Sequence, residues 1–302
     1  MRSPVPSRNG KRLFAEALIE GTELVRYDAA SRAFKPFLEG ISADGLAFSR
    51  DRSWVAYTSY PERSLWRCRA DGSDRRQLTD ASTKALLPSL SPDERTIAFM
   101  AQVPGKPWQI YLLAAEGGDA KPVTSSDEDQ ANPTWSPEGR SIAFAGAPWS
   151  KGWDPKTTSI HIIDLQSSRI RTLPGSEGLW SPRWSPVGNW LIAETTDSKQ
   201  LLLYSFSSRQ WRKLADAGRK TIGFSSWSHD SHFIYFNLVS PTENGIYRVG
   251  VNGKSPELVL PLDSLRLKET HGAWFTLTPE DQPLLLRDTS AEEIYALTLN
   301  YR

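Results

Sequence analysis

Few residues in this chain of 302 could do acid-base, nucleophilic or metal chemistry. The sequence holds four histidines and one cysteine, Cys68. His229 and His232 flank an expected turn three residues apart, without the cysteine or carboxylate companions of a metal site. His161 and His271 stand apart from them, so we expect structural histidines and no metal site. Cys68 is expected to be a packing residue, and a single cysteine allows no internal disulfide.

Sequence motifs of catalysis are also missing. No Gly-x-Ser-x-Gly nucleophile elbow occurs, and the nearest pattern, Gly175-Ser-Glu-Gly178, has the wrong spacing. No phosphate- or dinucleotide-binding glycine loop precedes a helix. Asp-Gly pairs recur without the spacing of an EF-hand, so they indicate hairpin turns instead of calcium loops. The sequence therefore predicts a protein that is not an enzyme and needs no cofactor.

The charge balance narrows the range of partners. The chain carries 36 Lys and Arg against 35 Asp and Glu, a formal net charge of +1. A surface for nucleic acid or an anionic membrane would have an excess of basic residues. No apolar run approaches the roughly 18 residues of a membrane span. We expect no direct contact of this chain with nucleic acid or membrane.

The sequence contains a repeated segment that must form the framework for any binding residues. The segment PTWSPEGRSIAF at 133–144 has relatives at 88–99 and 182–193 and weaker copies elsewhere. The Ser or Thr of the turn marks each copy, and successive markers are 42 to 50 residues apart: Ser7, Ser49, Ser91, Ser136, Ser185, Ser228 and Thr278. A period in the low forties with strand-like content predicts propeller blades.

Each copy has the same order of expected elements. A short strand leads into a Ser-Pro-Asp/Glu-Gly turn, and a β-branched and aromatic second strand follows. A third strand with an aliphatic-aromatic pair and a short fourth strand complete the copy. Four antiparallel strands make one blade. We predict an all-β propeller of seven blades, with six as the alternative, at 3–40, 41–80, 85–126, 129–176, 177–217, 219–264 and 265–302.

The two ends of the chain do not complete this pattern. The last copy stops after its third strand, 294–299, and no fourth-type strand precedes the first copy. In propellers, a strand from one terminus often completes the blade at the other. We therefore expect an incompletely closed ring with an unpaired outer strand. We also expect further sequence upstream of Met1.

The repeat resembles a known family. Trp-Ser-Pro-Asp/Glu-Gly-x-x-Ile-Ala-Phe, then Ile-Tyr, Asp-Gly-Gly and Leu-Thr, is similar to the TolB-like (WD40-like) propeller repeat of bacteria, best at 88–124 and 133–144. Segments 3–14, 48–51 and 283–288 with 293–296 resemble the C-terminal propeller of large bacterial signalling proteins. There, a winged-helix transcriptional regulator domain or a Ser/Thr kinase domain precedes the repeats. The resemblance implies a sensory or scaffold domain, covalently linked in a longer protein to a DNA-binding or kinase domain.

The candidate binding surface is one face of the propeller. Loops between second and third strands, and links between blades, should share the face opposite the Ser-Pro turns. We expect four tryptophans and a lysine there: Trp108, Trp149, Lys151, Trp153 and Trp180. Exposed aromatic residues are common at interaction hot spots. Packing between blades is the other interpretation, equally weighted for Trp108 and Trp180; binding is favoured for Trp149 and Trp153.

The functional hypothesis is a non-catalytic propeller that binds a protein, peptide or small envelope ligand on this tryptophan-bearing face. The alternative is the substrate-gating propeller of a prolyl-oligopeptidase-type serine peptidase without its catalytic domain. The terminal segment 295–302 reads as a natural end and favours the first hypothesis. The compartment stays open: periplasmic if the longer protein has a membrane helix before the propeller, otherwise cytoplasmic.

Overall fold

The computed structural model describes residues 2–147, 153–240, 243–253, 255–268 and 274–298, with the side chains of 2, 3 and 18 excepted. These residues form seven antiparallel sheets, six of four strands and one of three. One short 3-10 helix, η1 (Leu38–Gly40), lies between strands. Among the described residues no helix is long and apolar enough to cross a membrane. The prediction of an all-β propeller architecture is confirmed.

Five of the four-stranded sheets, here called blades I to V, use strands that follow one another in the chain. Blade I has β5 (Ala43–Phe48), β6 (Trp54–Ser59), β7 (Leu65–Arg69) and β8 (Arg76–Gln77). Blade II has β9 (Lys84–Leu90), β10 (Thr96–Gln102), β11 (Gln109–Ala114) and β12 (Lys121–Pro122). Blade III has β13 (Gln130–Trp135), β14 (Ser141–Gly146), β15 (Ile160–Asp164) and β16 (Ile170–Thr172). Blade IV has β17 (Leu179–Trp184), β18 (Trp190–Thr195), β19 (Gln200–Ser205) and β20 (Gln210–Asp216). Blade V has β21 (Thr221–Trp227), β22 (Phe233–Val239), β23 (Gly245–Gly250) and β24 (Glu257–Pro261).

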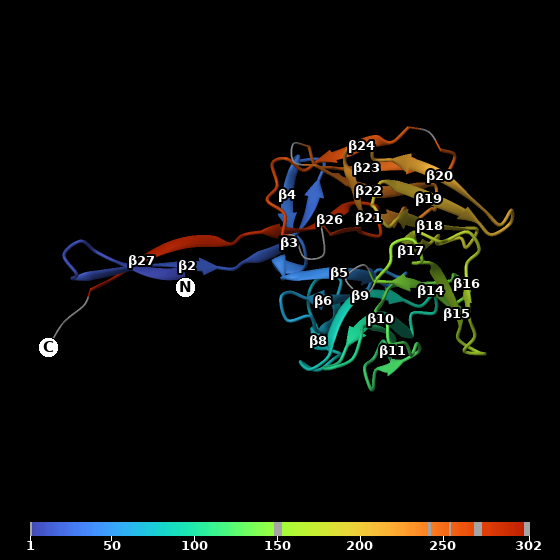
Figure 1. Cartoon of the computed structure of the whole chain (residues 1–302), viewed down its shortest axis with the longest axis horizontal. Helices are drawn as coiled ribbons and strands as arrows, with labels where there is room; N and C mark the ends of the chain where they lie inside the picture. The colour runs from blue at the N-terminus through green and yellow to red at the C-terminus, as the bar shows by residue number, and fades with distance from the viewer. Residues whose placement is uncertain (1, 148–152, 241–242, 254, 269–273, 299–302) are drawn as a thin grey trace.

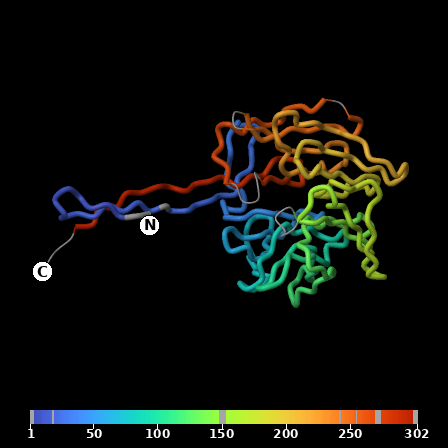
Figure 2. Tube along the Cα trace, viewed as in Figure 1, coloured from blue at the N-terminus to red at the C-terminus, as the bar shows by residue number. Residues whose placement is uncertain are grey.

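Blade VI joins the two ends of the chain. It pairs β25 (Phe275–Leu277) and β26 (Pro283–Asp288) with β3 (Thr22–Asp28) and β4 (Ala33–Pro36). The seventh sheet, here called the arm, contains β1 (Arg2–Pro6), β2 (Arg12–Ile19) and β27 (Ala291–Thr298). The arm projects away from the ring, and the first and last strands that the structure describes, β1 and β27, both lie on it (Figure 1; Figure 2).

This arrangement corrects the predicted blades 3–40 and 265–302, which are not separate sheets. Strand β26 pairs with β3 and β27 pairs with β2, so the two copies exchange their third strands. The pairs Thr22 with Asp288 and Ile19 with Ala291 belong to one uninterrupted register. Backbone hydrogen bonding continues across the junction, since the Thr289 N–H donates to the Gly21 carbonyl oxygen at 2.9 Å. The physical cause is one long antiparallel ladder from the ring into the arm.

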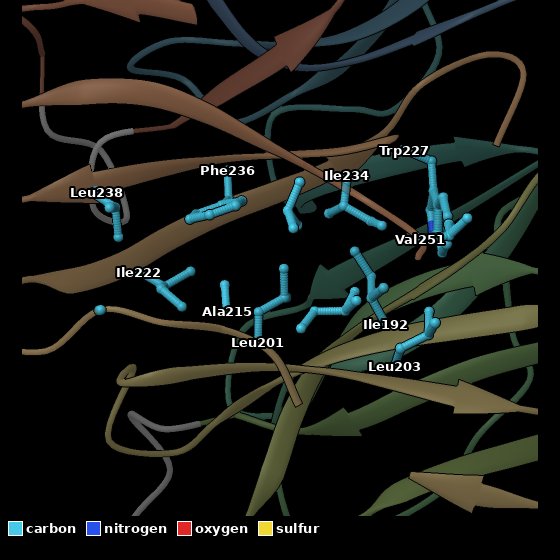
Figure 3. Packing of buried hydrophobic residues seen from close by; sticks show 13 residues of the cluster. Ile192, Leu201, Leu203, Ala215, Ile222, Trp227, Ile234, Phe236, Leu238 and Val251 are labelled. Atoms are coloured by element: carbon cyan, nitrogen blue, oxygen red, sulfur yellow. The ribbon is translucent and has the colours of Figure 1, made fainter. Parts of the chain in front are cut away.

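The ring itself is closed, contrary to the expected incomplete closure. Six clusters of buried apolar side chains each join two neighbouring blades, from I–II round to VI–I. Figure 3 shows the cluster between blades IV and V, where Ile192 and Leu203 face Ile234 and Trp227. Each blade must be apolar on both faces because it packs on two neighbours. The second strands accordingly have fully buried Ile-Ala-Phe runs, as at 97–99.

The repeated turn is held by side-chain hydrogen bonds that explain its sequence. In blade II the Ser91 hydroxyl donates to Asp93 at 2.6 Å, and the Thr96 N–H donates to Ser91 Oγ at 3.0 Å. The same Ser-to-Asp bond occurs in blade I, from Ser49 to Asp51. The serine bond holds the pKa of Asp51 and of Asp93 below the usual range of a carboxyl. The marker serine and the acidic residue are thus structural.

Candidate functional site

His161, His232 and Cys68 lie in surroundings where packing or turn formation accounts for each side chain. His161 packs on Phe144 with ring centroids 5.6 Å apart, and burial lowers its pKa. His232 lies 2.9 Å from Asp230 on an exposed turn. Cys68 is buried, and burial raises its pKa to about 11. No group of three His, Cys, Asp or Glu suited to a metal exists among the residues described. His271 lies outside the described residues.

The tryptophan-bearing face is described only in part, because Trp149 and Lys151 lie outside the described residues. Trp108 packs partly buried against the core between blades II and III, and Trp180 against the core between III and IV. Trp153 is also half-buried. The indole N–H groups of Trp153 and Trp180 are buried without an acceptor in the described part of the chain. Such unsatisfied donors would suit a ligand with hydrogen-bond acceptors. Binding on the tryptophan-bearing face stays a prediction.

On the opposite face, the Ser-Pro turns of the six blades contact one another in a complete circle. Each turn touches the next through one hydrogen bond, ion pair or glycine-proline contact. In order from I–II to VI–I these are Arg50 N–H to Glu94 Oε1, Gly139 beside Pro92, Gly188 beside Pro137, Val187 N–H to Ser231 Oγ at 3.3 Å, His229 N–H to Asp281 Oδ1 at 2.9 Å, and Arg52 Nη1 to Glu280 Oε1 at 2.8 Å. The seventh marker, Ser7, is on the arm.

The innermost strands of five blades share an irregularity in their pairing. In blades I to V, each first strand holds one extra residue where its pairing with the second strand shifts. In three blades a left-handed residue precedes a proline at this bulge: Leu87 (φ 50°), Asn132 (φ 60°) and Ser181 (φ 53°). A bulge re-aims side chains and is common beside functional sites.

The centre of the ring holds a cavity of about 390 Å³ lined by the first strands of all six blades. A second hollow of about 350 Å³ lies among the Ser-Pro turns. The residue two positions before each marker lines the central cavity in every blade: Ala47, Ser89, Thr134, Arg183, Ser226 and Thr276. Five of these side chains are small and uncharged. Arg183 is the exception and, among the described residues, the one charged side chain that lines the cavity.

The guanidinium group of Arg183 is held in place by neutral acceptors. Its Nη1 donates to the Pro182 carbonyl oxygen at 2.8 Å, and its Nη2 donates to Asn132 Oδ1 at 3.0 Å. Burial lowers the pKa of Arg183, but a guanidinium stays protonated at neutral pH in proteins. The cavity therefore contains a fixed positive charge with hydrogen-bond donors left over.

Glu194 is the carboxyl group whose charge acts on Arg183, and it is mostly neutral at pH 7. Glu194 is 1% exposed and accepts a hydrogen bond from Ser225 Oγ at 2.9 Å. Burial raises the pKa of Glu194 to about 8, against the opposing effects of the Ser225 bond and the Arg183 charge. The protonated form of Glu194 leaves the positive charge of Arg183 uncompensated. This arrangement can hold an anion.

Sequence reasoning missed this site, although a signal for it exists. Aligning the copies on their marker residue places Arg183 in a column whose other ring members are alanine, serine or threonine. Packing of the ring does not require a cation in a column of small residues, so this position is a candidate for binding. The mixed apolar and polar lining and the raised pKa of Glu194 fit the usual features of a binding pocket.

Comparison with solved structures identifies the fold. The putative TolB from Agrobacterium tumefaciens superposes with a TM-score of 0.71 at 18% identity, over 89% of this chain and 99% of that one. The TolB from Acinetobacter baumannii gives 0.62 at 17% identity, over 95% and 82%. The chain has the fold of a TolB-like β-propeller. An oligogalacturonate lyase from Vibrio parahaemolyticus matches this TolB-like propeller at a TM-score of 0.56 and 13% identity, over 88% and 77%.

At these identities the likeness concerns the fold alone, because unrelated functions share propellers. No protein-family model and no curated protein matches the sequence. The TolB-like part of the predicted resemblance is confirmed. The closer resemblance to propellers of regulators and kinases has no support among these structures.

Proposed function

We propose that this TolB-like propeller is a non-catalytic binding protein whose central cavity receives an anionic group of its ligand at Arg183. The observation that carries the proposal is the guanidinium of Arg183 in a cavity-lining column whose other five side chains are small and neutral. A carboxylate bound there would replace water on a group whose present acceptors are a carbonyl and an amide oxygen. Hydrogen bonds between charged groups are about twice as strong as neutral ones.

The proposal treats the ring as six-bladed, with the arm as a separate element. It also keeps the tryptophan-bearing face, where Trp153 and Trp180 offer buried N–H donors, as the second contact of an extended ligand. Thr196 of blade IV donates to the Pro155 carbonyl oxygen at 3.1 Å, so the loop after Trp153 leans on the blade that contains Trp180. A protein or peptide segment with acidic residues offers carboxylates for Arg183 and backbone carbonyl oxygens for the indole N–H groups.

The wider role that we propose is that of a sensory or scaffold domain in bacterial signalling, attached to a transcriptional regulator or kinase. That context rests on the sequence resemblance of segments 3–14, 48–51 and 283–288 with 293–296 alone. Binding through the cavity does not depend on it.

A lyase is the second candidate function. Oligogalacturonate lyases share the propeller fold, and the positive cavity would suit a carboxylated sugar as well as an acidic peptide. The chemistry separates the two functions. A lyase makes an unsaturated product with ultraviolet absorbance from oligogalacturonate, whereas a binding protein returns the oligosaccharide unchanged.

The experiment is calorimetric titration of the chain with an acidic peptide and with trigalacturonate. The test variant is Arg183→Ser, which installs the residue that blades II and V have at this position. Loss of a charged hydrogen bond should weaken anion binding by roughly 10- to 100-fold. Arg171→Ser, on the exposed strand β16, is the matched control and should bind as the original chain does. Equal binding by all three proteins, or no binding of either probe, would overturn the proposed site.

A further inference from the structure

Among the described residues, the arm repeats the pairing of a blade with three strands instead of four. In blade II, second-strand Met100 pairs with third-strand Ile110, nine residues after the marker Ser91. In the arm, Glu16 lies nine residues after Ser7 and pairs with Ile294, the first residue of the Ile-Tyr signature of its third strand. The arm therefore has the first three strands of a blade in blade register. In the ring, a fourth strand covers the outer edge of the third.

The side chains of the arm are as apolar as those of a blade, but they are exposed. Ile294 is 78% exposed, whereas its counterparts Ile110 and Ile246 are 0% exposed. Val5 and Leu297 are 62% and 50% exposed. None of the six interblade clusters contains an arm residue. A small sheet without a covered face is marginally stable in water. The arm would therefore be stabilised by contact with another protein surface.

The two edges of the arm differ in what they can accept. Strand β1 contains Pro4 and Pro6, which cannot donate to a neighbouring strand. Strand β27 has no proline. Because Thr289 directs its N–H toward Gly21, the odd-numbered residues of β27 bond to β2. The N–H and C=O groups of 292, 294, 296 and 298 point away from β2, toward the open edge.

We propose that β27 pairs with β27 of a second copy of this chain, so that two arms form one six-stranded antiparallel sheet around a twofold axis. The axis passes beside Tyr295, which lies opposite its own counterpart. Ile294 then lies opposite Ala296 of the other copy, and both residues offer the outward-pointing groups that such a ladder needs. This proposal is independent of the cavity.

Charge favours this register over one centred on Glu293. With Tyr295 on the axis, Glu292 lies opposite Thr298 of the second copy and on the same side of the sheet. Thr298 pairs within its own arm with Arg12. Arg12 and Glu292 of different copies are thus two strands apart, about 10 Å between backbones, across a small threonine. Long side chains can bridge that distance. Symmetry makes two such Arg–Glu pairs, while a register centred on Glu293 would set like charges opposite each other.

Charge reversal tests the pairing in the intact chain. Analytical ultracentrifugation should show a monomer–dimer equilibrium for the original protein. Arg12→Glu and Glu292→Arg should each raise the dimer dissociation constant at least about tenfold, because two ion pairs become repulsive. The double variant R12E/E292R should return to the original value. The proposal would be overturned if the chain stays monomeric at every concentration, or if the dimer dissociation constant is the same for the original protein and all three variants.

Cysteine substitution tests the register itself. Tyr295→Cys places two sulfurs opposite each other across the axis, where directly opposed Cβ atoms are about 5 Å apart. This variant should form a disulfide-linked dimer under mild oxidation. Leu297→Cys is the matched control, since its counterpart would lie four residues along the strand, about 13 Å away. Cys68 is buried and does not compete. Equal cross-linking of the two variants, or none by Tyr295→Cys in a protein that dimerises, would reject this register.

Discussion

The indole Nε1 of Trp227 in blade V donates a hydrogen bond of 3.0 Å to the backbone carbonyl oxygen of Arg183 in blade IV. The same bond joins blades II and III, where Trp135 Nε1 donates to the Ser89 carbonyl oxygen at 2.9 Å. Both acceptors belong to the column of residues that lines the cavity. The bulky residue before the Ser-Pro turn therefore locks a blade to its neighbour at the point where the cavity is shaped.

Trp227→Phe should destabilise the ring by about 1–2 kcal/mol, since it removes this bond while leaving an aromatic ring in place. The matched control is Trp184→Phe, because Trp184 Nε1 donates within its own blade, to the Gly188 carbonyl oxygen at 3.3 Å. Urea denaturation of both variants measures the difference. The interblade role of Trp227 would be contradicted by equal losses of stability.

The stability of the protein should fall as the pH rises from about 4.5 to about 8. Glu194 has a pKa of about 8 in the folded protein. The unfolded chain releases that proton near pH 4.5, so in this interval the folded state binds more protons. Each pKa unit corresponds to about 1.4 kcal/mol, so the effect is at most several kcal/mol. Glu194→Gln should flatten this part of the profile, which unfolding midpoints between pH 4 and 9 will reveal.

Anion binding should weaken above pH 8 for a related reason. There Glu194 becomes a carboxylate and compensates the charge of Arg183. In Glu194→Gln the amide oxygen can still accept the Ser225 hydrogen bond, and no charge develops. Calorimetric titration at pH 7 and pH 9 should show a drop in affinity for the original chain only. The same drop in Glu194→Gln would assign the pH dependence to another group.

Two glycines of blade V give a matched pair of packing tests. A Cβ on Gly223 would lie 2.5 Å from Asn237 Oδ1, whereas a Cβ on Gly250 would meet nothing nearer than 3.9 Å. Overfilling a packed site costs about 1–3 kcal/mol. Gly223→Ala should therefore lower the free energy of unfolding by that amount, and Gly250→Ala should be nearly neutral. Thermal and urea denaturation measure both.

Removing the arm should leave the ring folded. A chain of residues 21–290 keeps all six interblade clusters and the Gly21–Thr289 backbone bond. We expect far-ultraviolet circular dichroism of a β protein and a cooperative unfolding transition. A chain that aggregates or unfolds without cooperativity would show that the arm contributes to ring stability.

The turn chemistry could be predicted from the sequence because it is local. Ser91, Asp93 and Thr96 close the turn among themselves. The marker hydroxyl accepts a backbone N–H in every copy, and it donates to an aspartate in the copies that have one two residues later. The exchange of third strands could not be predicted. The segments 22–28 and 291–298 have similar lengths and apolar content, and backbone bonds let either one pair with β2 or β26. Which pairing forms depends on the whole ring.

The site could be predicted only in part for the same reason. The tryptophan face follows from counting loops along one chain. Arg183 could be recognised as a site residue only after ring closure placed it beside five small residues that are distant in sequence.

The continuous ladder from the arm into blade VI gives the molecule a direction of mechanical weakness. Its pairs run from Arg12–Thr298 at the distal end to Arg26–Leu284 inside the ring. A pulling force that separates residues 12 and 298 loads one pair at a time, as in the opening of a zipper, instead of shearing many bonds together. The arm would open first at low force, and the rupture would then travel past Gly21 into the blade that closes the ring.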